Sequence, residues 1–378
     1  MKKIAWITSN NFIEVDLPIV KNLSKENNLE IIWYVIFTKN RINNYSINDI
    51  RQELNYMNIK TNFIFLNNRF RSILTFLKIF RFIVKLRLTK PNILYIDCII
   101  EPYLSVIVKL FFNTKRVIIA LHDVELHSGS PRIQNYLQNF KIFLFSNFHV
   151  FSNTQQSIFN SKYGLKKSFN IPLYLQQYGE SNNLPNNDMI HFLFFGTIRK
   201  NKGLEYLIEA ANKLSISHKG KFNIRIAGKC NDWSLYDNLI LDKDVFEIST
   251  EAVPNENIAD LYCKSHYIIL PYKDVTQSGP LMLAFNYGIP IIASNLPGFK
   301  ELITDKEIGY LFNSEDSDSL YSVMSMIIDS DNSEYYTMKS NLIKNVKLKY
   351  NINEICSLYT EMFNNLEKII ILTKRMER

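Results

Sequence analysis

The sequence predicts an α/β protein made of two doubly wound, Rossmann-like domains with an interdomain cleft. The chain has 378 residues, which is more than one ordinary domain core accommodates. Short apolar runs alternate with amphipathic helical runs in both halves, an order typical of parallel sheets covered by helices. This alternation is interrupted near residues 174–188 by a stretch rich in Gln, Asn, Gly and Pro, which indicates a connection between domains.

Each half is expected to form one domain, at residues 1–180 and 189–350, and residues 351–378 a terminal helix packing back toward the first domain. The strands expected in the first domain cover residues 3–8, 29–37, 61–66, 93–95, 116–121 and 148–151, and the helices 17–25, 48–57, 71–88 and 103–112. The strands expected in the second domain cover residues 191–195, 222–227, 245–248, 267–270, 290–293 and 309–312. Its expected helices cover residues 204–214, 233–241, 257–263, 281–287 and 317–330.

Composition and spacing exclude several classes of protein. A hydrophobic content of 47% with 21% charged residues is typical of a packed soluble chain rather than a disordered one. The four cysteines lie far apart and show no metal-ligand spacing, which favours a reducing compartment. No run of eighteen apolar residues occurs, so we expect a cytoplasmic protein. Ser9-Asn10-Asn11 follows the first strand in place of Gly-x-Gly-x-x-Gly, so no nicotinamide or flavin cofactor is expected.

Positive charge is concentrated in the first domain, because residues 54–96 contain no Asp or Glu. Within this stretch, the helical spacing places on one face Arg71, Lys78, Arg81 and Lys85. The opposite face is expected to carry Ile73, Phe76, Leu77, Phe80, Ile83 and Val84. Such a helix either belongs to the domain with a solvated basic face or binds an anionic membrane surface. No nucleic-acid partner is expected, since no aromatic-basic recognition motif accompanies the charges.

A basic loop follows the first strand of the second domain. Residues 190–195 are apolar, Gly196 comes next, and residues 204–214 carry apolar side chains at helical spacing. Arg199 and Lys202 therefore lie at the carboxyl end of a strand, where ligands of open α/β sheets bind. Two cations with no acid between them suit a phosphate or diphosphate. A basic surface loop without a ligand is the alternative interpretation.

A second loop leads into the helix expected at residues 281–287. Ser278 or Thr276 is placed to cap this helix, Pro280 suits its first turn, and Gly288 is placed to end it. The N-terminus of such a helix offers unpaired amides to an anion. A capped helix with a purely structural role is the alternative.

A third loop, after the strand at residues 116–121, gathers four ionisable residues within six positions: His122, Asp123, Glu125 and His127. This density favours a functional role for His122. A single histidine or acid is otherwise commonly a satisfied structural residue.

The order of these loops resembles the GT-B fold retaining glycosyltransferases of family 4, the glycosyl transferases group 1. Residues 196–203 match the Gly-x-x-Arg-x-x-Lys-Gly element of that family, and the resemblance is strongest over residues 190–312. It implies an acceptor-side first domain and a donor-side second domain. It also implies that Gly196, Arg199 and Lys202 bind the diphosphate of a UDP- or GDP-sugar, with no metal ion and no other cofactor.

The loop before residue 281 departs from the main pattern of the family. Two glutamates eight residues apart are typical there, and Val275 and Leu283 stand at those positions in this chain. The loop instead resembles a subgroup with a Thr-Gln-Ser-Gly tetrapeptide. That resemblance implies donor contacts from Thr276, Gln277, Ser278 and Gly279.

The resemblance also suggests roles for the remaining loops. Glu301 matches a Gly-x-x-Glu element, where it contacts the donor or stabilises its own loop. His122 and Asp123 are the expected catalytic residues, with Asp123 orienting His122 or the acceptor. His127 is expected on the acceptor side, and so are Asn10 and Asn11, the latter two only from their place on the loop after the first strand.

The resemblance implies transfer of a sugar, with retention, from a nucleotide-diphosphate donor to a saccharide or lipid-linked acceptor. It further implies surface polysaccharide biosynthesis of capsule or O-antigen type, at the inner face of the plasma membrane. Two alternatives stay open. One is a GT-B nucleotide-sugar epimerase, and the other is a catalytically inactive homologue acting as a binding subunit, which the two replaced glutamates favour.

Overall fold

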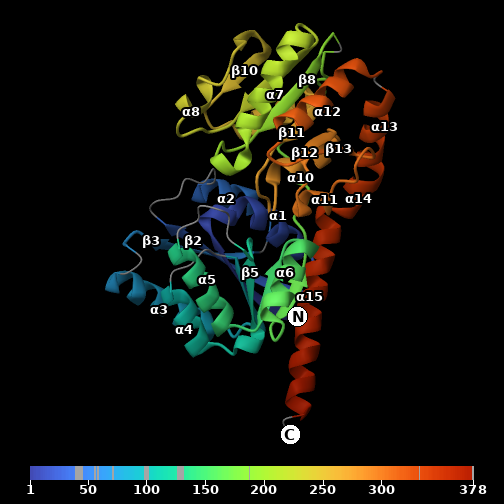
Figure 1. Ribbon diagram of the computed structural model, residues 1–378. Coiled ribbons are helices and arrows are strands. Elements are labelled where there is room, and N and C mark those ends of the chain that lie inside the picture. The colour runs from blue at the N-terminus through green and yellow to red at the C-terminus, as the bar shows by residue number, and fades with distance from the viewer. Residues whose placement is uncertain are drawn as a thin grey trace. The chain divides into compact units, whose positions relative to one another are not determined.

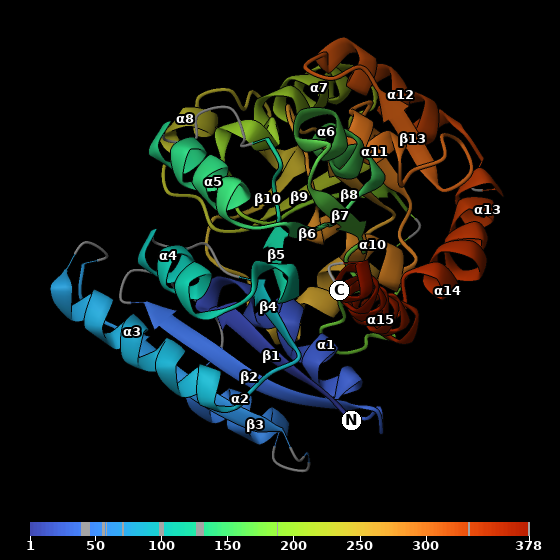
Figure 2. The same ribbon diagram turned by 90° about the horizontal axis from the view of Figure 1, so that it is seen from below.

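The computed structural model describes residues 1–38, 46–54, 57, 59–69, 72–97, 102–125, 132–186, 188–331 and 333–376. It confirms an α/β fold with two parallel sheets (Figures 1 and 2). The chain divides into two compact units. Unit 1 comprises Met1–Leu173 with Ile352–Arg378, and unit 2 comprises Tyr174–Asn351. The cleft expected between the domains stays a prediction.

Unit 1 contains a seven-stranded sheet of order β3-β2-β1-β4-β5-β6-β7, in which every neighbouring pair is parallel. Its strands are β1 (Lys2–Ser9), β2 (Leu29–Thr38), β3 (Lys60–Leu66), β4 (Ile93–Asp97), β5 (Val117–Leu121), β6 (Asn147–Val150) and β7 (Lys167–Asn170). Its helices are α1 (Ile13–Leu23), α2 (Ile47–Leu54), α3 (Ile73–Leu88), α4 (Pro102–Phe111), α5 (Arg132–Leu144), α6 (Asn153–Tyr163) and α15 (Ile352–Met376). The short helices η1 (Asn10–Phe12) and η2 (Thr114–Arg116) precede α1 and β5.

The central strands of unit 1 are apolar along their length because helices cover both faces of the sheet. Residues 4–7 of β1 and 93–96 of β4 are all buried. The strand order reverses between β1 and β4, and the crevice at the carboxyl ends of two such strands is where ligands of open α/β sheets bind. Helix α15 packs against α1, and Lys2 of β1 pairs with Glu367 of α15 at 3.1 Å.

Unit 2 contains a six-stranded parallel sheet of order β10-β9-β8-β11-β12-β13. Its strands are β8 (Ile190–Phe195), β9 (Phe222–Ala227), β10 (Phe246–Ser249), β11 (Tyr267–Leu270), β12 (Ile291–Ser294) and β13 (Gly309–Phe312). Its α-helices are α7 (Leu204–Ser217), α8 (Ser234–Asp237), α9 (Asn255–Cys263), α10 (Gly279–Tyr287), α11 (Pro297–Lys300), α12 (Ser317–Asp329), α13 (Ser333–Asn341) and α14 (Lys347–Lys349). Three further elements are η3 (Lys200–Lys202), η4 (Lys243–Val245) and the π-helical turn η5 (Leu342–Val346).

The strand order of unit 2 reverses between β8 and β11. The loop after β8 carries Gly196, Arg199 and Lys202, and the loop after β11 leads to α10. Both loops therefore begin at neighbouring strand ends, at the switch point of the sheet. This topology brings together two segments that lie about eighty residues apart in the sequence.

Helix α3 corrects one expectation. Its core side is formed by Thr75, Ile79, Phe82, Ile83 and Leu86. Ile73, Leu77 and Phe80 were expected on the buried side, but they are exposed, as are Lys78, Arg81 and Lys85. Apolar residues occur around most of this helix, so hydrophobicity alone does not select the face that packs against the sheet and α4. Arg71 lies outside the described residues.

Within the described part of the chain, no helix combines the length and the apolar character needed to cross a membrane.

Candidate functional site

In unit 2, the backbone segments that leave β8 and β9 approach each other closely. Gly196 has a φ of 113°, and its amide donates to the carbonyl oxygen of Ala227 at 3.0 Å. A Cβ atom on Gly228 would lie 2.0 Å from the carbonyl oxygen of Gly196. Only glycine fits such an approach, so the turn after β8 depends on both residues.

The basic loop is held against the chain that follows β11. The amide of Lys273 donates to the carbonyl oxygen of Asn201 at 3.0 Å, and Asn201 Nδ2 donates to Asp274 Oδ1 at 3.1 Å. Gly203 adopts a left-handed conformation with a φ of 61°. A Cβ atom there would lie 1.9 Å from the carbonyl oxygen of Pro271, so the two loops meet without a side chain between them.

The cations of this loop differ in their surroundings. Lys202 Nζ lies 3.6 Å from the ring centroid of Tyr272, whose side chain is 1% exposed. Arg199 is exposed. Lys273 instead forms an ion pair with Glu205, and that hydrogen bond raises the pKa of Lys273. Within the described part of the chain no salt bridge involves Arg199 or Lys202, so their charges are available to an anion.

The N-terminus of α10 lies beside the glycine turn. Ser278 caps the helix by accepting a hydrogen bond from the amide of Leu281 at 3.3 Å, as its sequence position predicts. A Cβ atom on Gly196 would lie 3.3 Å from Pro280 Cγ, in the first turn of the helix. Pro280 has no N–H and Ser278 binds the amide of Leu281, so the amide of Gly279 and the positive end of the helix dipole, next to Gly196 and the basic loop, form the site suited to an anion such as a phosphate.

The other predicted donor residues lie in the same part of unit 2. Thr276 and Gln277 are half-buried in the segment before the cap, and Gly279 opens α10. Helix α11 packs against that segment, because a Cβ atom on Gly298 would lie 3.0 Å from the carbonyl oxygen of Val275. Glu301 follows at the C-terminal end of α11 and is half-buried.

Leu283, one of the two positions where the family pattern has glutamate, is 3% exposed and belongs to the buried side of α10. Position 283 therefore serves packing in this chain.

Sequence reasoning missed a hollow of about 740 Å³ in unit 2. It is lined by the ends of β9 and β10, by α9 and by the loop between β10 and α9, which carries Val253 and Pro254. Ala227 also lines the hollow, and its carbonyl oxygen accepts the hydrogen bond from the amide of Gly196. The hollow therefore borders the turn at Gly196. The sequence offers only a weak signal for it, namely a loop at a strand end before the Pro254 that precedes α9.

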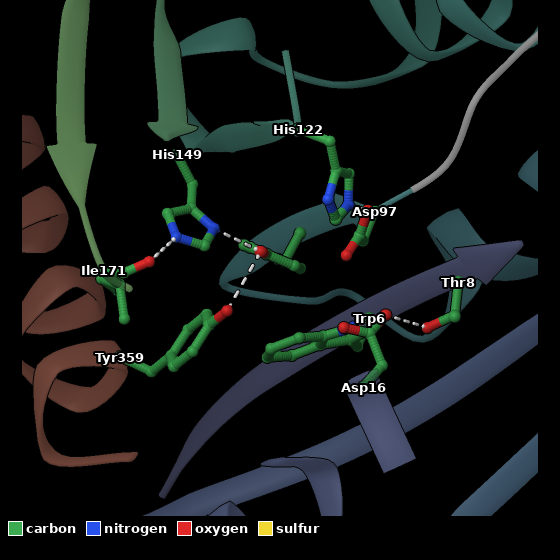
Figure 3. A network of polar contacts seen from close by, with 9 residues as sticks. Trp6, Thr8, Asp16, Asp97, His122, His149, Ile171 and Tyr359 are labelled. Atoms are coloured by element: carbon green, nitrogen blue, oxygen red, sulfur yellow. Dashed lines mark hydrogen bonds and ion pairs between the residues drawn. The ribbon is translucent and has the colours of Figure 1, made fainter. Parts of the chain in front are cut away.

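In unit 1, His122 directly follows β5 and is held from three sides, one of them by Asp97 (Figure 3). Its Nε2 lies 2.8 Å from Asp97 Oδ1 at the end of β4. The imidazole stacks between the rings of Phe12 and Phe151, at centroid distances of 3.9 Å and 4.4 Å. The side chain of His122 is 21% exposed, so the ring is oriented by its neighbours and still reaches the surface.

Asp97 stands beside a second buried acid, Asp16 of α1. Asp16 Oδ2 accepts hydrogen bonds from Trp6 Nε1 at 2.9 Å and from Thr8 Oγ1 at 2.6 Å. Burial raises the pKa of Asp16 well above its usual value, and the charge of Asp97 raises it further. Neither acid was predicted. The available signals were Asp97 at the end of an apolar strand and Asp16 among apolar helix residues.

A buried histidine lies behind this pair (Figure 3). His149 Nε2 lies 2.9 Å from the carbonyl oxygen of Ile171, and its Nδ1 lies 2.7 Å from the hydroxyl of Tyr95. A carbonyl only accepts, so Nε2 carries the proton and Nδ1 accepts from Tyr95. Burial lowers the pKa of His149 to about 4, which keeps the ring neutral at neutral pH.

The remaining predicted residues of unit 1 have different surroundings. Asn10 is buried at the end of β1 and accepts a hydrogen bond from Thr38 Oγ1 at 3.4 Å, whereas Asn11 is exposed. Asp123 is half-buried, and its backbone carbonyl accepts from Gln138 Nε2 at 2.8 Å. Its expected role in orienting His122 stays a prediction. His127 lies outside the described residues.

Among the described residues, no three side chains of His, Cys, Asp or Glu gather into an arrangement able to hold a metal ion.

In a comparison with known families, residues 190–330 match the model of the family described as glycosyl transferases group 1. Two curated bacterial proteins are similar to part of the chain. An uncharacterised 41.2 kDa protein in the cps region of Klebsiella pneumoniae is 22% identical over 179 residues, which are 47% of this chain and 47% of that protein. An uncharacterised glycosyltransferase of Haemophilus influenzae is 28% identical over 167 residues, 43% of this chain and 46% of that protein. The matches span about half the length of these relatives.

Solved structures share the fold over nearly the whole chain. Sucrose-phosphate synthase from Thermosynechococcus elongatus has a TM-score of 0.74 and 14% identity, and the match covers 98% of this chain and 100% of that one. HepE of Anabaena, solved in complex with UDP-glucose, has a TM-score of 0.71 and 14% identity, with 97% and 100% covered. The fold is that of the GT-B glycosyltransferases, and the family match supports a glycosyltransferase of group 1.

Proposed function

We propose that this chain is a glycosyltransferase that transfers a sugar from a nucleoside-diphosphate donor to a saccharide or lipid-linked acceptor. The observation that carries the proposal is the anion site of unit 2. There, Arg199 and Lys202 stand on a loop beside the N-terminus of α10, at the switch point of the sheet. The match of residues 190–330 to the group 1 family supports the same assignment for this unit.

The proposed donor is a UDP-sugar or a GDP-sugar. HepE of Anabaena was solved with UDP and with UDP-glucose, which supports a UDP-sugar for a chain of this fold. The diphosphate binds between the basic loop and the N-terminus of α10, with Thr276, Gln277 and Ser278 in reach of its distal end. The hollow bordering the glycine turn receives the nucleoside, because it opens next to Gly196.

The proposed chemistry follows from the charges of the site. The departing nucleoside diphosphate gains negative charge as the glycosidic bond breaks, and fixed cations stabilise that charge. Arg199 and Lys202 supply this stabilisation without a metal ion. The proposed outcome is retention, in which the acceptor proton passes to an oxygen of the leaving diphosphate, so no strong base is needed. His122 positions the reacting sugar or stabilises its charge.

The proposed acceptor is located at an anionic membrane surface. Helix α3 is proposed to bind that surface. The exposed side of this helix combines Leu77 and Phe80 with Lys78, Arg81 and Lys85. Exposed apolar side chains among cations are the pattern by which helices bind the interface of an anionic bilayer. Helix α4 packs beside α3 and exposes Leu110 and Lys109, which extends the same surface. The relative in the Klebsiella cps region supports a role in surface polysaccharide synthesis.

The direct test is turnover of UDP-sugars and GDP-sugars with and without saccharide acceptors, read by release of the nucleoside diphosphate and by NMR of the sugar. A transferase shows slow donor hydrolysis without acceptor and a faster, configuration-retaining transfer with one. Both are lost in His122→Ala, which still binds donor. A change of sugar configuration in the free donor, with no transfer, would indicate an epimerase instead. Donor binding without any turnover would indicate an inactive binding subunit.

A further inference from the structure

The feature that carries a further inference is the pair of buried acids behind His122 (Figure 3). Asp16 is 0% exposed and Asp97 is 1% exposed. Within the described residues neither acid forms a salt bridge with Lys or Arg, and the cationic partner available is His122 on Asp97. Buried acids without a cation are costly in the ionised form, so their oxygens need hydrogen-bond donors.

The donors around the pair account for two of the four carboxyl oxygens. Asp16 Oδ2 receives the hydrogens of Trp6 and Thr8, and Thr8 in turn accepts from Trp33 Nε1 at 2.7 Å. Asp97 Oδ1 faces His122 Nε2. The other two oxygens, Asp16 Oδ1 and Asp97 Oδ2, are fully buried and have no donor among the described residues.

A proton between Asp16 Oδ1 and Asp97 Oδ2 would give both oxygens a hydrogen-bond partner. Figure 3 shows the side chains of Asp16 and Asp97 next to each other, and the charge of Asp97 raises the pKa of Asp16. Two ionised carboxylates only accept, so a hydrogen bond between them requires a proton on one. A buried pair of this kind titrates as a unit, and one member keeps its proton at neutral pH.

We propose that Asp16 and Asp97 share one proton and that this pair holds His122 as the tautomer protonated on Nε2. Asp16 carries the proton on Oδ1, because its burial outweighs the hydrogen bonds from Trp6 and Thr8, which favour the ionised form, and because His122 faces Asp97. Asp97 keeps the negative charge and accepts both from Asp16 and from His122 Nε2. Asp16 and Asp97 are thus positioning residues. Their contribution to catalysis rests on the proposed function.

The surrounding groups leave this arrangement undisturbed. Among the described residues, the titratable side chains that face the pair are His122, His149 of β6, Tyr95 of β4 and Tyr359 of α15. Burial raises the pKa of both tyrosines, so they stay neutral, and His149 is neutral because burial lowers its pKa. His149 is also bonded to Tyr95 and Ile171. Within the part of the chain that the structure describes, no neighbouring cation therefore competes with His122 for Asp97.

The orientation of the ring follows from the same contacts. Phe12 lies nearly parallel to the imidazole, at an interplanar angle of 5°, and fixes the plane of the ring. Asp97 fixes the rotation within that plane by holding Nε2. With the proton on Nε2, the lone pair of the neutral ring lies on Nδ1, so the pair determines which nitrogen is basic.

Infrared and NMR spectroscopy of the full chain test the proposal without requiring turnover. At neutral pH we expect a protonated carboxyl band, which disappears in Asp16→Asn. We also expect the ¹⁵N signals of His122, assigned by their loss in His122→Gln, to show the Nε2–H form. The side-chain amide in Asp16→Asn still donates to Asp97, so this variant keeps that tautomer, whereas Asp97→Ala removes the acceptor of the Nε2 proton and populates both tautomers. Absence of the carboxyl band, or an Nδ1–H form in the wild type, overturns the proposal.

Kinetics add a second readout where turnover is measurable. We expect Asp97→Ala to lower kcat at least about 10-fold with little change in donor KM, because ring orientation matters in the transition state. Asp16→Asn should lose less activity than Asp16→Ala. Equal losses in these two variants would contradict a positioning role. If the chain turns over no donor while the spectra behave as expected, the proposed function fails and the shared proton stands.

Discussion

Lys202 Nζ lies 3.6 Å above the ring of Tyr272, so the cation is held against the face of a buried aromatic side chain. A cation over an aromatic face gains about 0.5–2 kcal/mol, depending on solvation. The contact also limits the rotamers of Lys202, which lowers the entropy cost of binding an anion. Tyr272 was not singled out in the sequence, where it is one of 21 tyrosines.

Tyr272→Leu is therefore expected to weaken UDP or GDP binding by roughly 3- to 30-fold, and Tyr272→Phe by less than about 2-fold, because the ring is retained. Isothermal titration calorimetry measures both. Tyr206→Leu is the matched control. Lys273 Nζ lies 5.3 Å from the ring centroid of Tyr206, but Lys273 is already paired with Glu205. Equal weakening by Tyr272→Leu and Tyr206→Leu would show that the Lys202 contact has no special role.

Gly203→Ala is expected to destabilise unit 2 strongly. The left-handed backbone alone costs an alanine about 1–2 kcal/mol, and the Cβ atom would lie 1.9 Å from a backbone oxygen of Pro271. Gly220→Ala separates the two effects, because Gly220 has a φ of 80° and no atom within 4 Å of the added Cβ. Urea unfolding should show a loss in Gly203→Ala that exceeds the loss in Gly220→Ala by roughly 2 kcal/mol or more. Equal losses of unfolding free energy in the two variants would mean that the basic loop moves away from Pro271 at little cost.

The buried acid pair predicts a pH dependence of stability. The pKa of Asp16 is raised in the folded chain, so the native state keeps a proton that the unfolded state loses above about pH 4. Its contribution to stability is present below that pH and is lost as the pH rises toward the native pKa. Asp16→Asn has no proton to lose, so it should gain stability relative to the wild type by up to about 1.4 kcal/mol per pH unit.

Urea unfolding between about pH 4 and pH 8 measures this trend. Asp242→Asn serves as a control of opposite sign, because the hydrogen bond from Lys219 lowers the pKa of the half-buried Asp242. That variant should lose a little stability relative to the wild type as the pH rises. A flat difference between Asp16→Asn and the wild type would mean that Asp16 is ionised in the folded chain.

The surface of α3 is expected to bind anionic vesicles. Each cation near such a surface contributes about 1 kcal/mol, so Lys78→Ala with Arg81→Ala should weaken binding by roughly 30-fold. Sedimentation with phosphatidylglycerol and with phosphatidylcholine vesicles measures this, and added salt should weaken only the former. Lys219→Ala with Lys243→Ala is the control of equal charge in unit 2. Equal binding to both vesicle types would contradict the membrane proposal.

Much of the fold could be predicted because each strand and helix of a parallel α/β domain has its own apolar pattern within a short stretch of sequence. The six strands of unit 2 lie close to the predicted positions, since each is a short apolar run flanked by loops. In unit 1 the helices α5 and α6 and the strand β7 were missed. Helix α6 has weak amphipathic character, and β7 is half-buried at the edge of the sheet, so neither has a strong periodic signal.

The candidate sites divide in the same way. Arg199, Lys202 and Ser278 stand in local motifs, and the structure places their loops side by side. Asp97 lies 25 positions before His122, and Asp16 lies 81 positions before Asp97. Such partners meet only through the order of the strands, which single-sequence patterns do not determine.

Calorimetric titration of the chain with UDP and with GDP tests the central claim most directly. The wild type should bind at least one of them, and Arg199→Ala with Lys202→Ala should weaken that binding at least about 100-fold, because each charged hydrogen bond contributes about 1.5–3 kcal/mol. Lys219→Ala, which removes a cation just before β9 at the opposite edge of the sheet, should bind like the wild type. Binding of neither nucleotide by the wild type, or undiminished binding by the double variant, would contradict the account.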